Sequence, residues 1–322
     1  MIDPLITLAG AFVGFVVGLT GMGGGALMTP ILVLLFGIEP LAAVSSDIVA
    51  SMIMKPIGGG VHWRRGTVHG GLVKWLVLGS VPSAFLGVLL LRRLGSGSAL
   101  QSHVRLALGI ALLVVTVGLV VKPLLALRRK AGESDQPLVV KPLPTVLIGV
   151  LGGVVVGLTS VGAGSLMIVL LLALYPRLRL SELVGTDLVQ AVPLVASAAI
   201  GHLLFGSFEL GLTVSILIGS IPGVFVGARF SSRAPDYVIR PSLAVVLLLS
   251  GLKLVGASNL LLALVSPVSV AVGLSYGLAA ARRARRKRAA QAVALPHTNG
   301  TPLPVPALAG ASGAPRAEHS QN

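Results

Sequence analysis

The sequence predicts an all-α polytopic membrane protein made of two inverted repeats, each with about five helical segments of which one is broken or short, and one extra C-terminal helix. Three observations predict this: the composition, a series of long apolar segments, and an internal duplication. Hydrophobic residues make up 54% of the 322 residues and charged residues 11%, and the mean hydropathy is +0.96. A soluble domain needs about 25% charged residues to cover its surface, so this composition excludes the ordinary soluble classes.

The same composition excludes several kinds of site and partner. The chain has no Cys, which excludes disulfides and thiolate metal sites, and its 4% of aromatic residues does not fit an outer-membrane barrel. The net charge of +15 includes a basic run at 282–288 that directly follows an apolar segment. Basic residues beside membrane spans contact anionic headgroups, and no aromatic residues for base stacking accompany this run. We therefore expect a lipid bilayer as partner and no nucleic acid.

Long apolar segments occur on both sides of a charged, turn-rich stretch at 128–137. About 20 residues of helix cross the hydrocarbon core, and most of the segments have this length. Segments 26–38 and 161–175 are too short. The expected organisation is a first membrane repeat (1–127), a cytoplasmic linker (128–142), a second membrane repeat (143–257), an extra transmembrane helix (258–281) and a basic, disordered cytoplasmic tail (282–322).

The two halves are repeats of one another. Their paired motifs are always 139 or 140 positions apart, a register that chance apolar similarity would not keep. The pairs are 18–28 with 157–167, 45–49 with 185–189, His62 with His202, and 79–87 with 219–227.

Loop charge predicts that the repeats are inverted. Arg64 and Arg65 follow the third segment of the first half, whereas the equivalent turn at 203–209 has no Lys or Arg. Cytoplasmic loops carry an excess of Lys and Arg, so equivalent turns are expected on opposite faces. This orientation gives an external N-terminus and a cytoplasmic C-terminus in the plasma membrane, the bacterial inner membrane.

The glycine-rich motifs are the first candidate site. Gly21 to Ala26 formally fits a dinucleotide-binding pattern, but that pattern needs a βαβ unit around it. Between apolar helices, a broken membrane helix is the better interpretation, because the short helix after the break would present free N–H groups to an anion. The alternative is that the glycines only permit close helix packing. The candidate substrate-binding glycines are Gly23, Gly24, Gly25, Gly162 and Gly164.

Polar residues at the start of two long segments form the second candidate site. The hydroxyls of Ser45, Ser46 and Thr186, with Gln190, are candidate ligands of an oxyanion, although residues of these types also cap helices. With inverted repeats, both copies should converge near the membrane midplane. A carboxylate does not attract an anion, so Asp47 and Asp187 are candidates for carrying a proton or joining a polar network.

Lys55 and two histidines complete the candidates. Lys55 lies deep in an apolar segment, before Pro56, and a charge in a span generally faces a cavity or a partner. It is a candidate substrate ligand, and snorkelling or pairing with Asp47 is the alternative. His62 and His202 titrate near neutral pH in ordinary surroundings, so they are candidates for proton coupling, with structural hydrogen bonding as the alternative. We expect no metal and no cofactor.

These motifs resemble those of the TauE/SafE family of sulfite exporters. The resemblance rests on 18–25 with its second copy, on Ser46–Asp47 and Thr186–Asp187 followed by a His near a turn, and on the paired Gly-Ser-x-Pro motifs; it covers about residues 5–257. It implies a polytopic plasma-membrane protein that moves sulfite or related sulfur-containing anions, usually outward. The second glycine motif, Ser160 to Gly164, departs from the family pattern.

The sequence thus favours a secondary transporter that exports sulfite or a related small (organo)sulfur anion. The first alternative is a passive anion channel. An enzyme is not expected, because the sequence offers neither a metal cluster nor a nucleophile–base pair. The expected partner is a small anionic substrate, and a homodimer is left open.

Overall fold

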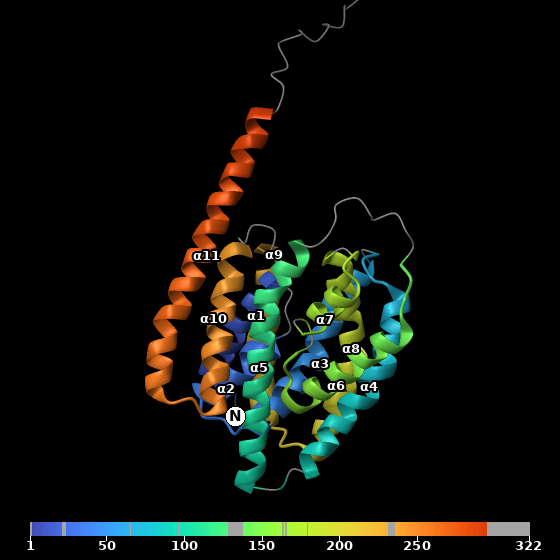
Figure 1. The fold of residues 1–322 in the computed structure, drawn as a ribbon. Helices are drawn as coiled ribbons and strands as arrows, with labels where there is room; N and C mark the ends of the chain where they lie inside the picture. Colours follow the sequence, from blue (N-terminus) through green and yellow to red (C-terminus); the bar gives the residue numbers. More distant parts are fainter. Residues whose placement is uncertain are drawn as a thin grey trace, which may run out of the picture. The chain divides into compact units, whose positions relative to one another are not determined.

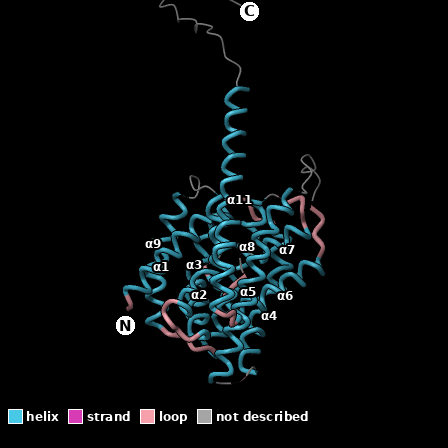
Figure 2. Tube along the Cα trace, turned by 60° about the vertical axis from the view of Figure 1, so that its left-hand side comes forward, coloured by secondary structure: helices cyan, strands magenta, loops and turns pink. Residues whose placement is uncertain are grey.

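The computed structural model of the chain describes residues 2–20, 24–64, 66–93, 95, 97–127, 138–162, 164, 166–178, 180–230 and 236–294. Within these ranges the secondary structure is helical, and the tube in Figure 2 shows helices joined by loops, with no strand. The helices are α1 (Pro4–Thr20), α2 (Gly25–Leu34), α3 (Pro40–Arg64), α4 (Gly70–Arg93), α5 (Gly97–Leu127), α6 (Pro142–Thr159), α7 (Leu166–Leu174), α8 (Leu180–Phe205), α9 (Leu210–Phe230), α10 (Asp236–Val255) and α11 (Asn259–Ala294).

The protein is an all-α polytopic membrane protein, as the sequence predicts. Among the described residues, six helices are long and apolar enough to cross a membrane: α3, α4, α5, α6, α8 and α9. Such sequences are helical because lipid offers no partner for backbone N–H and C=O groups, which must therefore bond within the segment. Proline begins both α3 and α6, where its missing N–H costs no helical hydrogen bond.

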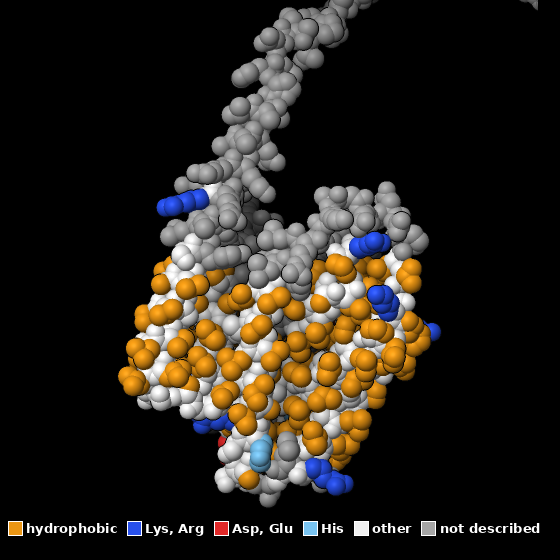
Figure 3. Space-filling view, in the orientation of Figure 1, with side chains coloured by type: hydrophobic (Ala, Val, Ile, Leu, Met, Phe, Trp, Pro, Cys, Tyr) orange, Lys and Arg blue, Asp and Glu red, His pale blue; other side chains and the backbone are white. Residues whose placement is uncertain are grey.

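The surface shown in Figure 3 is largely apolar, with a few Lys and Arg side chains toward the upper and lower parts of the view. Large apolar side chains on many helices are exposed, among them Leu8, Leu86, Leu147 and Phe225. A soluble protein rarely exposes a continuous apolar surface of this extent. The surface therefore agrees with a protein that faces lipid.

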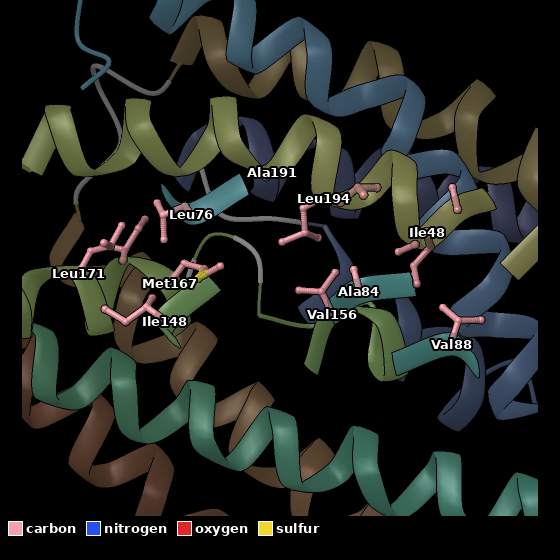
Figure 4. Packing of buried hydrophobic residues seen from close by; sticks show 14 of the residues in the cluster. Ile48, Leu76, Ala84, Val88, Ile148, Val156, Met167, Leu171, Ala191 and Leu194 are labelled. Atoms are coloured by element: carbon pink, nitrogen blue, oxygen red, sulfur yellow. The ribbon is translucent and has the colours of Figure 1, made fainter. Parts of the chain in front are cut away.

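Two hydrophobic clusters lie inside residues 1–280. The first joins α4, α6, α7 and α8 with one side of α3 and with Val104 of α5, and Figure 4 shows Val156 of α6 beside Ala84 of α4 in it. The second joins α1, α2, α5, α9 and α10, together with Ala43 and Ala50 of α3. Each cluster therefore contains helices from both halves of the sequence.

The halves pack against each other reciprocally. A Cβ on Gly79 of α4 would collide with the carbonyl oxygen of Val146 in α6, and one on the equivalent Gly219 of α9 would collide with that of Thr7 in α1. Further along α9, Gly223 lies against Ala11 and Gly227 against Phe15. Both positions advance together, so α1 and α9 run parallel, as do α4 and α6. Figure 1 shows α4 and α6 next to each other.

Helices α5 and α10, which are equivalent in the two halves, run antiparallel. A Cβ on Gly109 of α5 would lie 3.0 Å from the backbone nitrogen of Val255, near the end of α10. Gly251, earlier in α10, lies against Leu113, later in α5. The residue number in α5 increases as that of its contact in α10 decreases, so these two equivalent helices point in opposite directions.

Residues 281–322 form a separate unit. Helix α11 continues to Ala294, so residues 282–294, which we expected to be disordered, are helical. Ala, Arg and Lys are strong helix formers, and they dominate this stretch. The rest of the expected tail, 295–322, and most of the expected linker, at 128–137, lie outside the described residues.

Candidate functional site

A short helix begins at each glycine motif, and residues 21–23 of the first motif lie outside the described part of the chain. Helix α1 ends at Thr20 and α2 begins at Gly25, while α6 ends at Thr159 and α7 begins at Leu166. The short helices α2 and α7 have 10 and 9 residues, which span about 15 Å or less at 1.5 Å per residue. Neither crosses a membrane by itself. Both halves therefore contain the short helix that the sequence predicts.

The second break has an unusual backbone. Ser160 has φ 60°, and it is the one non-glycine residue with positive φ in the described part of the chain. Gly162 and Gly164 follow with φ 119° and 106°, and both are buried. A left-handed conformation costs an ordinary residue about 1–3 kcal/mol, so the surroundings must hold Ser160 in place.

The two breaks touch each other. A Cβ added to Gly25, the first residue of α2, would lie 2.6 Å from Ser160 Oγ and would collide with the Ser160 carbonyl oxygen. A glycine is therefore required for this close approach. Gly24 lies at the N-cap of α2, and Gly23 lies outside the described residues.

Asp47 of α3 ties the two breaks together. Its Oδ2 accepts hydrogen bonds from Thr29 Oγ1 of α2 at 3.0 Å and from Ser160 Oγ at 2.6 Å. All three side chains are buried. A hydrogen bond contributes about 0.5–1.5 kcal/mol to stability, so the bond from Ser160 Oγ to Asp47 offsets part of the backbone strain at Ser160.

Asp187, the equivalent of Asp47, has different neighbours. Its Oδ1 accepts a hydrogen bond from Gln190 Nε2 at 3.0 Å, and Gln190 Oε1 accepts one from Ser80 Oγ of α4 at 3.2 Å. All of these side chains are buried. The network joins α8 to α4, and so joins helices of different repeats.

Lys55 lies between the two carboxylates. It is half-buried on α3 and interacts electrostatically with Asp187 and, less strongly, with Asp47. Ser45 pairs with His202, and Gly59 lies against Val189, so α3 and α8 run antiparallel. Asp47 precedes Lys55 by two turns, about 12 Å along the axis. The two aspartates flank Lys55 along the contact between α3 and α8.

The hydroxyls of Ser46 and Thr186 have equivalent structural partners. Thr186 Oγ1 accepts a hydrogen bond from the backbone N–H of His69, just before α4, at 3.0 Å. Ser46 Oγ accepts one from the backbone N–H of Glu209, just before α9, at 3.3 Å. Each hydroxyl therefore caps the start of a neighbouring helix. This agrees with helix capping, the alternative role that the sequence left open for these residues.

His202 bridges three segments. Its Nδ1 lies 2.9 Å from Ser45 Oγ, and its Nε2 lies 2.8 Å from the carbonyl oxygen of Gly157. Since a carbonyl oxygen only accepts, Nε2 carries the proton. His62 is half-buried near the end of α3, with its Nδ1 2.9 Å from Thr67 Oγ1. These contacts fit structural hydrogen bonding.

Sequence reasoning missed Thr29, Ser80 and the role of Ser160. Ser160 was visible only as a departure from the glycine pattern, and Thr29 has Ile168 at its equivalent position, so no repeat signal marks it. Asp47 and Ser160 are separated by 113 residues, a pairing that a single sequence does not reveal. In the described residues no three His, Cys, Asp or Glu side chains form a group that would hold a metal ion.

Comparison with known proteins identifies the family. The family model described as sulfite exporter TauE/SafE matches residues 6–254. The chain is 40% identical over 252 residues to the probable membrane transporter protein YjnA of Bacillus subtilis, covering 78% of this chain and 98% of the relative. It is 25% identical over 256 residues to YdhB of the same organism, a probable membrane transporter protein, covering 78% and 99%. No solved structure matches. The chain therefore belongs to the TauE/SafE family, and it is a multi-pass membrane transporter.

Proposed function

We propose that the protein is a secondary transporter that exports sulfite or a related small (organo)sulfur anion across the plasma membrane, with its C-terminus in the cytoplasm. The observation that carries the proposal is the contact between the two helix breaks at Gly25 and Ser160, with Lys55 on the adjoining helix. The N-terminus of a short helix attracts anions through its free N–H groups and its dipole. In transporters, such ends of discontinuous helices bind anionic groups.

Lys55 supplies the positive charge of the proposed site. A cation within a membrane span is costly and generally faces a partner or a pathway. Its repeat equivalent is Val195, so the site is asymmetric. The sulfur-containing substrate class is supported by the family match, whose description names sulfite export.

We further propose that the halves form an inverted repeat. The reciprocal pairs Gly79–Val146 and Gly219–Thr7 support a two-fold relation between the halves. The antiparallel α5 and α10 support an axis across the helices, because an axis along them would leave equivalent helices parallel. Cysteines at Arg64 and Ser207, both exposed, should react from opposite faces of the membrane. Labelling from one face contradicts the inversion.

The moving parts in this proposal mix the two repeats. One bundle, called bundle A, contains α1, α2, α3 and α9, and the other, bundle B, contains α4, α6, α7 and α8. Backbone contacts at glycines lock α1 to α9 and α4 to α6 so closely that an added methyl group would collide. One repeat therefore cannot rock against the other without breaking both contacts. The site lies between the bundles, with Asp47 and Lys55 in A and Ser160 and Asp187 in B.

The experiment is uptake into proteoliposomes across a panel of sulfite, methanesulfonate, sulfate and thiosulfate, with the native protein, Lys55→Ala and Lys55→Arg. Hydrogen bonds to charged groups contribute about 1.5–3 kcal/mol, so Lys55→Ala should lower flux about ten- to a hundredfold, and Lys55→Arg should retain more. Lys74→Ala, at an exposed position of α4, is the matched control.

Native flux of no anion in the panel contradicts the proposed function. Flux that Lys55→Ala leaves unchanged contradicts the proposed site. Flux that never accumulates substrate against a gradient identifies a passive channel in place of a carrier.

A further inference from the structure

Asp47 accepts the hydrogen bonds of two hydroxyl groups at the contact between the breaks. Thr29 Oγ1 and Ser160 Oγ converge on the same oxygen, Oδ2, at 3.0 and 2.6 Å. In chemical terms, the side chain is an oxyanion held by donors from both repeats. A substrate oxyanion that enters between the breaks meets donors that an internal carboxylate already uses.

The charges around the proposed site do not favour an additional anion. Among the described side chains of the spanning helices, the buried or half-buried acidic and Lys residues are Asp47, Asp187, Lys55 and, in the first turn of α8, Glu182; Lys253 is half-buried near the end of α10. Lys55 interacts more strongly with Asp187 than with Asp47, so this pair is close to neutral and Asp47 supplies the excess negative charge. A substrate anion 4 Å from ionised Asp47 is repelled by about 4 kcal/mol at an effective dielectric constant of about 20.

We infer that Asp47 binds a proton when the substrate anion binds, so that one proton travels with each anion; this inference rests on the proposed function. The proton comes from the aqueous phase on the loading side and joins the Asp47 carboxylate, and no other bond changes. Neutral Asp47 releases the hydroxyls of Thr29 and Ser160 to the anion. Proton and anion leave together on the other side, and transport of a monovalent anion is electroneutral.

The second half cannot repeat this arrangement at Asp187. The positions equivalent to Thr29 and Ser160 are Ile168 and Gly21, which carry no hydroxyl. Asp187 instead accepts a hydrogen bond from the amide of Gln190 and interacts with Lys55. The asymmetry assigns the coupling proton to Asp47.

Other titratable groups lie on the elements that pack against α3. His202 of α8 uses both ring nitrogens, on Ser45 and on the Gly157 carbonyl. The described α2 has no titratable side chain. Among described side chains, the remaining charged or titratable residues on elements that pack against α3 are His103 and Arg105 of α5, Glu182 of α8, Glu209 before α9 and Arg229 of α9, of which all but Glu182 are exposed; the side chain of Lys122 of α5 lies outside the description.

The test measures anion flux and proton flux together in proteoliposomes that contain a pH-sensitive dye. Sulfite changes its own protonation near neutral pH, so methanesulfonate, which stays monovalent, is the second probe. For the native protein we expect one proton for each methanesulfonate and no response to membrane potential. Asp47→Asn, which imitates neutral Asp47, should carry the anion without a proton and should respond to membrane potential. Glu39→Gln, at an exposed carboxylate before α3, is the control.

A second variant guards against misfolding of Asp47→Asn. Ser160→Gly accepts the left-handed backbone and removes one donor from the carboxylate. This substitution should raise the KM for the anion. It should also move the flux maximum toward higher pH, because the charged form of Asp47 loses a hydrogen bond that stabilises it. Thr116→Val, which removes a buried hydroxyl that bonds to its own helix at Leu112, should change neither.

The outcomes separate the two proposals. Anion flux without proton flux in the native protein, or coupling that persists in Asp47→Asn, overturns the inference and leaves the transporter standing. Native flux of no anion in the panel overturns the proposed function and this inference with it.

Discussion

His202 illustrates, at the scale of a single residue, how a side chain that titrates in water becomes structural. It is buried, and both ring nitrogens have partners on α3 and α6. A charged imidazolium would have to turn the Ser45 hydroxyl around and leave its own charge in an apolar environment. The contacts therefore favour a neutral ring that holds three segments in register.

This interpretation predicts the effect of His202→Ala. The substitution leaves Ser45 and the Gly157 carbonyl without their partner and opens a cavity, so stability should fall by about 2–4 kcal/mol. Denaturant unfolding in detergent measures this loss. His103→Ala, at an exposed position of α5, should cost less than about 0.5 kcal/mol. A changed pH profile of transport in the folded variant would instead assign a proton-coupling role to His202.

The sequence predicts which polar residues lie within the spans more readily than what they bind. Asp47 and Lys55 stand out because a charged side chain in an apolar segment is costly unless it has a partner or faces a cavity. Their partners do not stand out, because Thr29 and Ser160 are ordinary hydroxyl residues that only the tertiary fold brings to Asp47. The hydroxyls of Ser46 and Thr186 are ambiguous in sequence, since capping and anion binding use the same residue types.

At the scale of helices, glycine sets how closely the two halves approach. Gly10, Gly14, Gly219 and Gly223 face backbone atoms across the α1–α9 contact. Small residues at such contacts let helix backbones approach closely, and packing then supplies much of the association energy in lipid. From the sequence alone, the glycines could serve either close helix packing or helix breaking. In the structure, different glycines serve each of these roles.

Gly219→Ala tests the packing role. The added methyl group would collide with the carbonyl oxygen of Thr7, a backbone atom that cannot rotate away. Overpacking of this kind costs about 1–3 kcal/mol, which unfolding in detergent should show. Gly60→Ala, in α3 where a Cβ meets nothing within 4 Å, should be neutral or stabilising by up to about 1 kcal/mol. Equal effects of the two substitutions would refute tight packing at Gly219.

The breaks were more predictable than the pairing of the helices. Segments shorter than a span and rich in glycine predict α2 and α7 directly, although α7 begins five residues later than the apolar segment from 161 suggested. That α1 packs on α9, and α4 on α6, depends on contacts between halves. A single sequence shows that two copies exist, but it does not show which helix of one copy meets which helix of the other.

For the whole molecule, each of the proposed moving bundles combines helices of both halves. Each cluster combines helices of both halves, and the interface between bundles A and B follows α3 and α8. The candidate residues Asp47, Lys55, Asp187 and Gln190 all belong to these two helices. In the proposed mechanism, a change in how the bundles meet exposes a substrate bound there to one side of the membrane or the other.

Two pairs of cysteines distinguish motion of bundle against bundle from motion of repeat against repeat, and the native chain has no Cys to interfere. A Cβ on Gly201 of α8 would lie 3.0 Å from Val88 Cβ of α4, and one on Gly59 of α3 would lie 3.3 Å from Val192 Cγ2 of α8. Disulfides need Cβ atoms about 3.5–4.5 Å apart, so a small adjustment brings the 88–201 pair into range; positions 59 and 192 are neighbours across the contact between α3 and α8. Val88→Cys with Gly201→Cys joins the two repeats within bundle B, whereas Gly59→Cys with Val192→Cys joins bundle A to bundle B.

We expect the oxidised 88–201 link to leave transport within about twofold of its reduced level, and the 59–192 link to stop transport until a reductant is added. If the repeats moved against each other, the 88–201 disulfide would join the two moving bodies and would stop transport. Anion flux in proteoliposomes, measured before and after reduction on the same preparation, provides each variant with its own control. Loss of flux in the oxidised 88–201 variant, recovered on reduction, would show that the repeats themselves are the moving bodies.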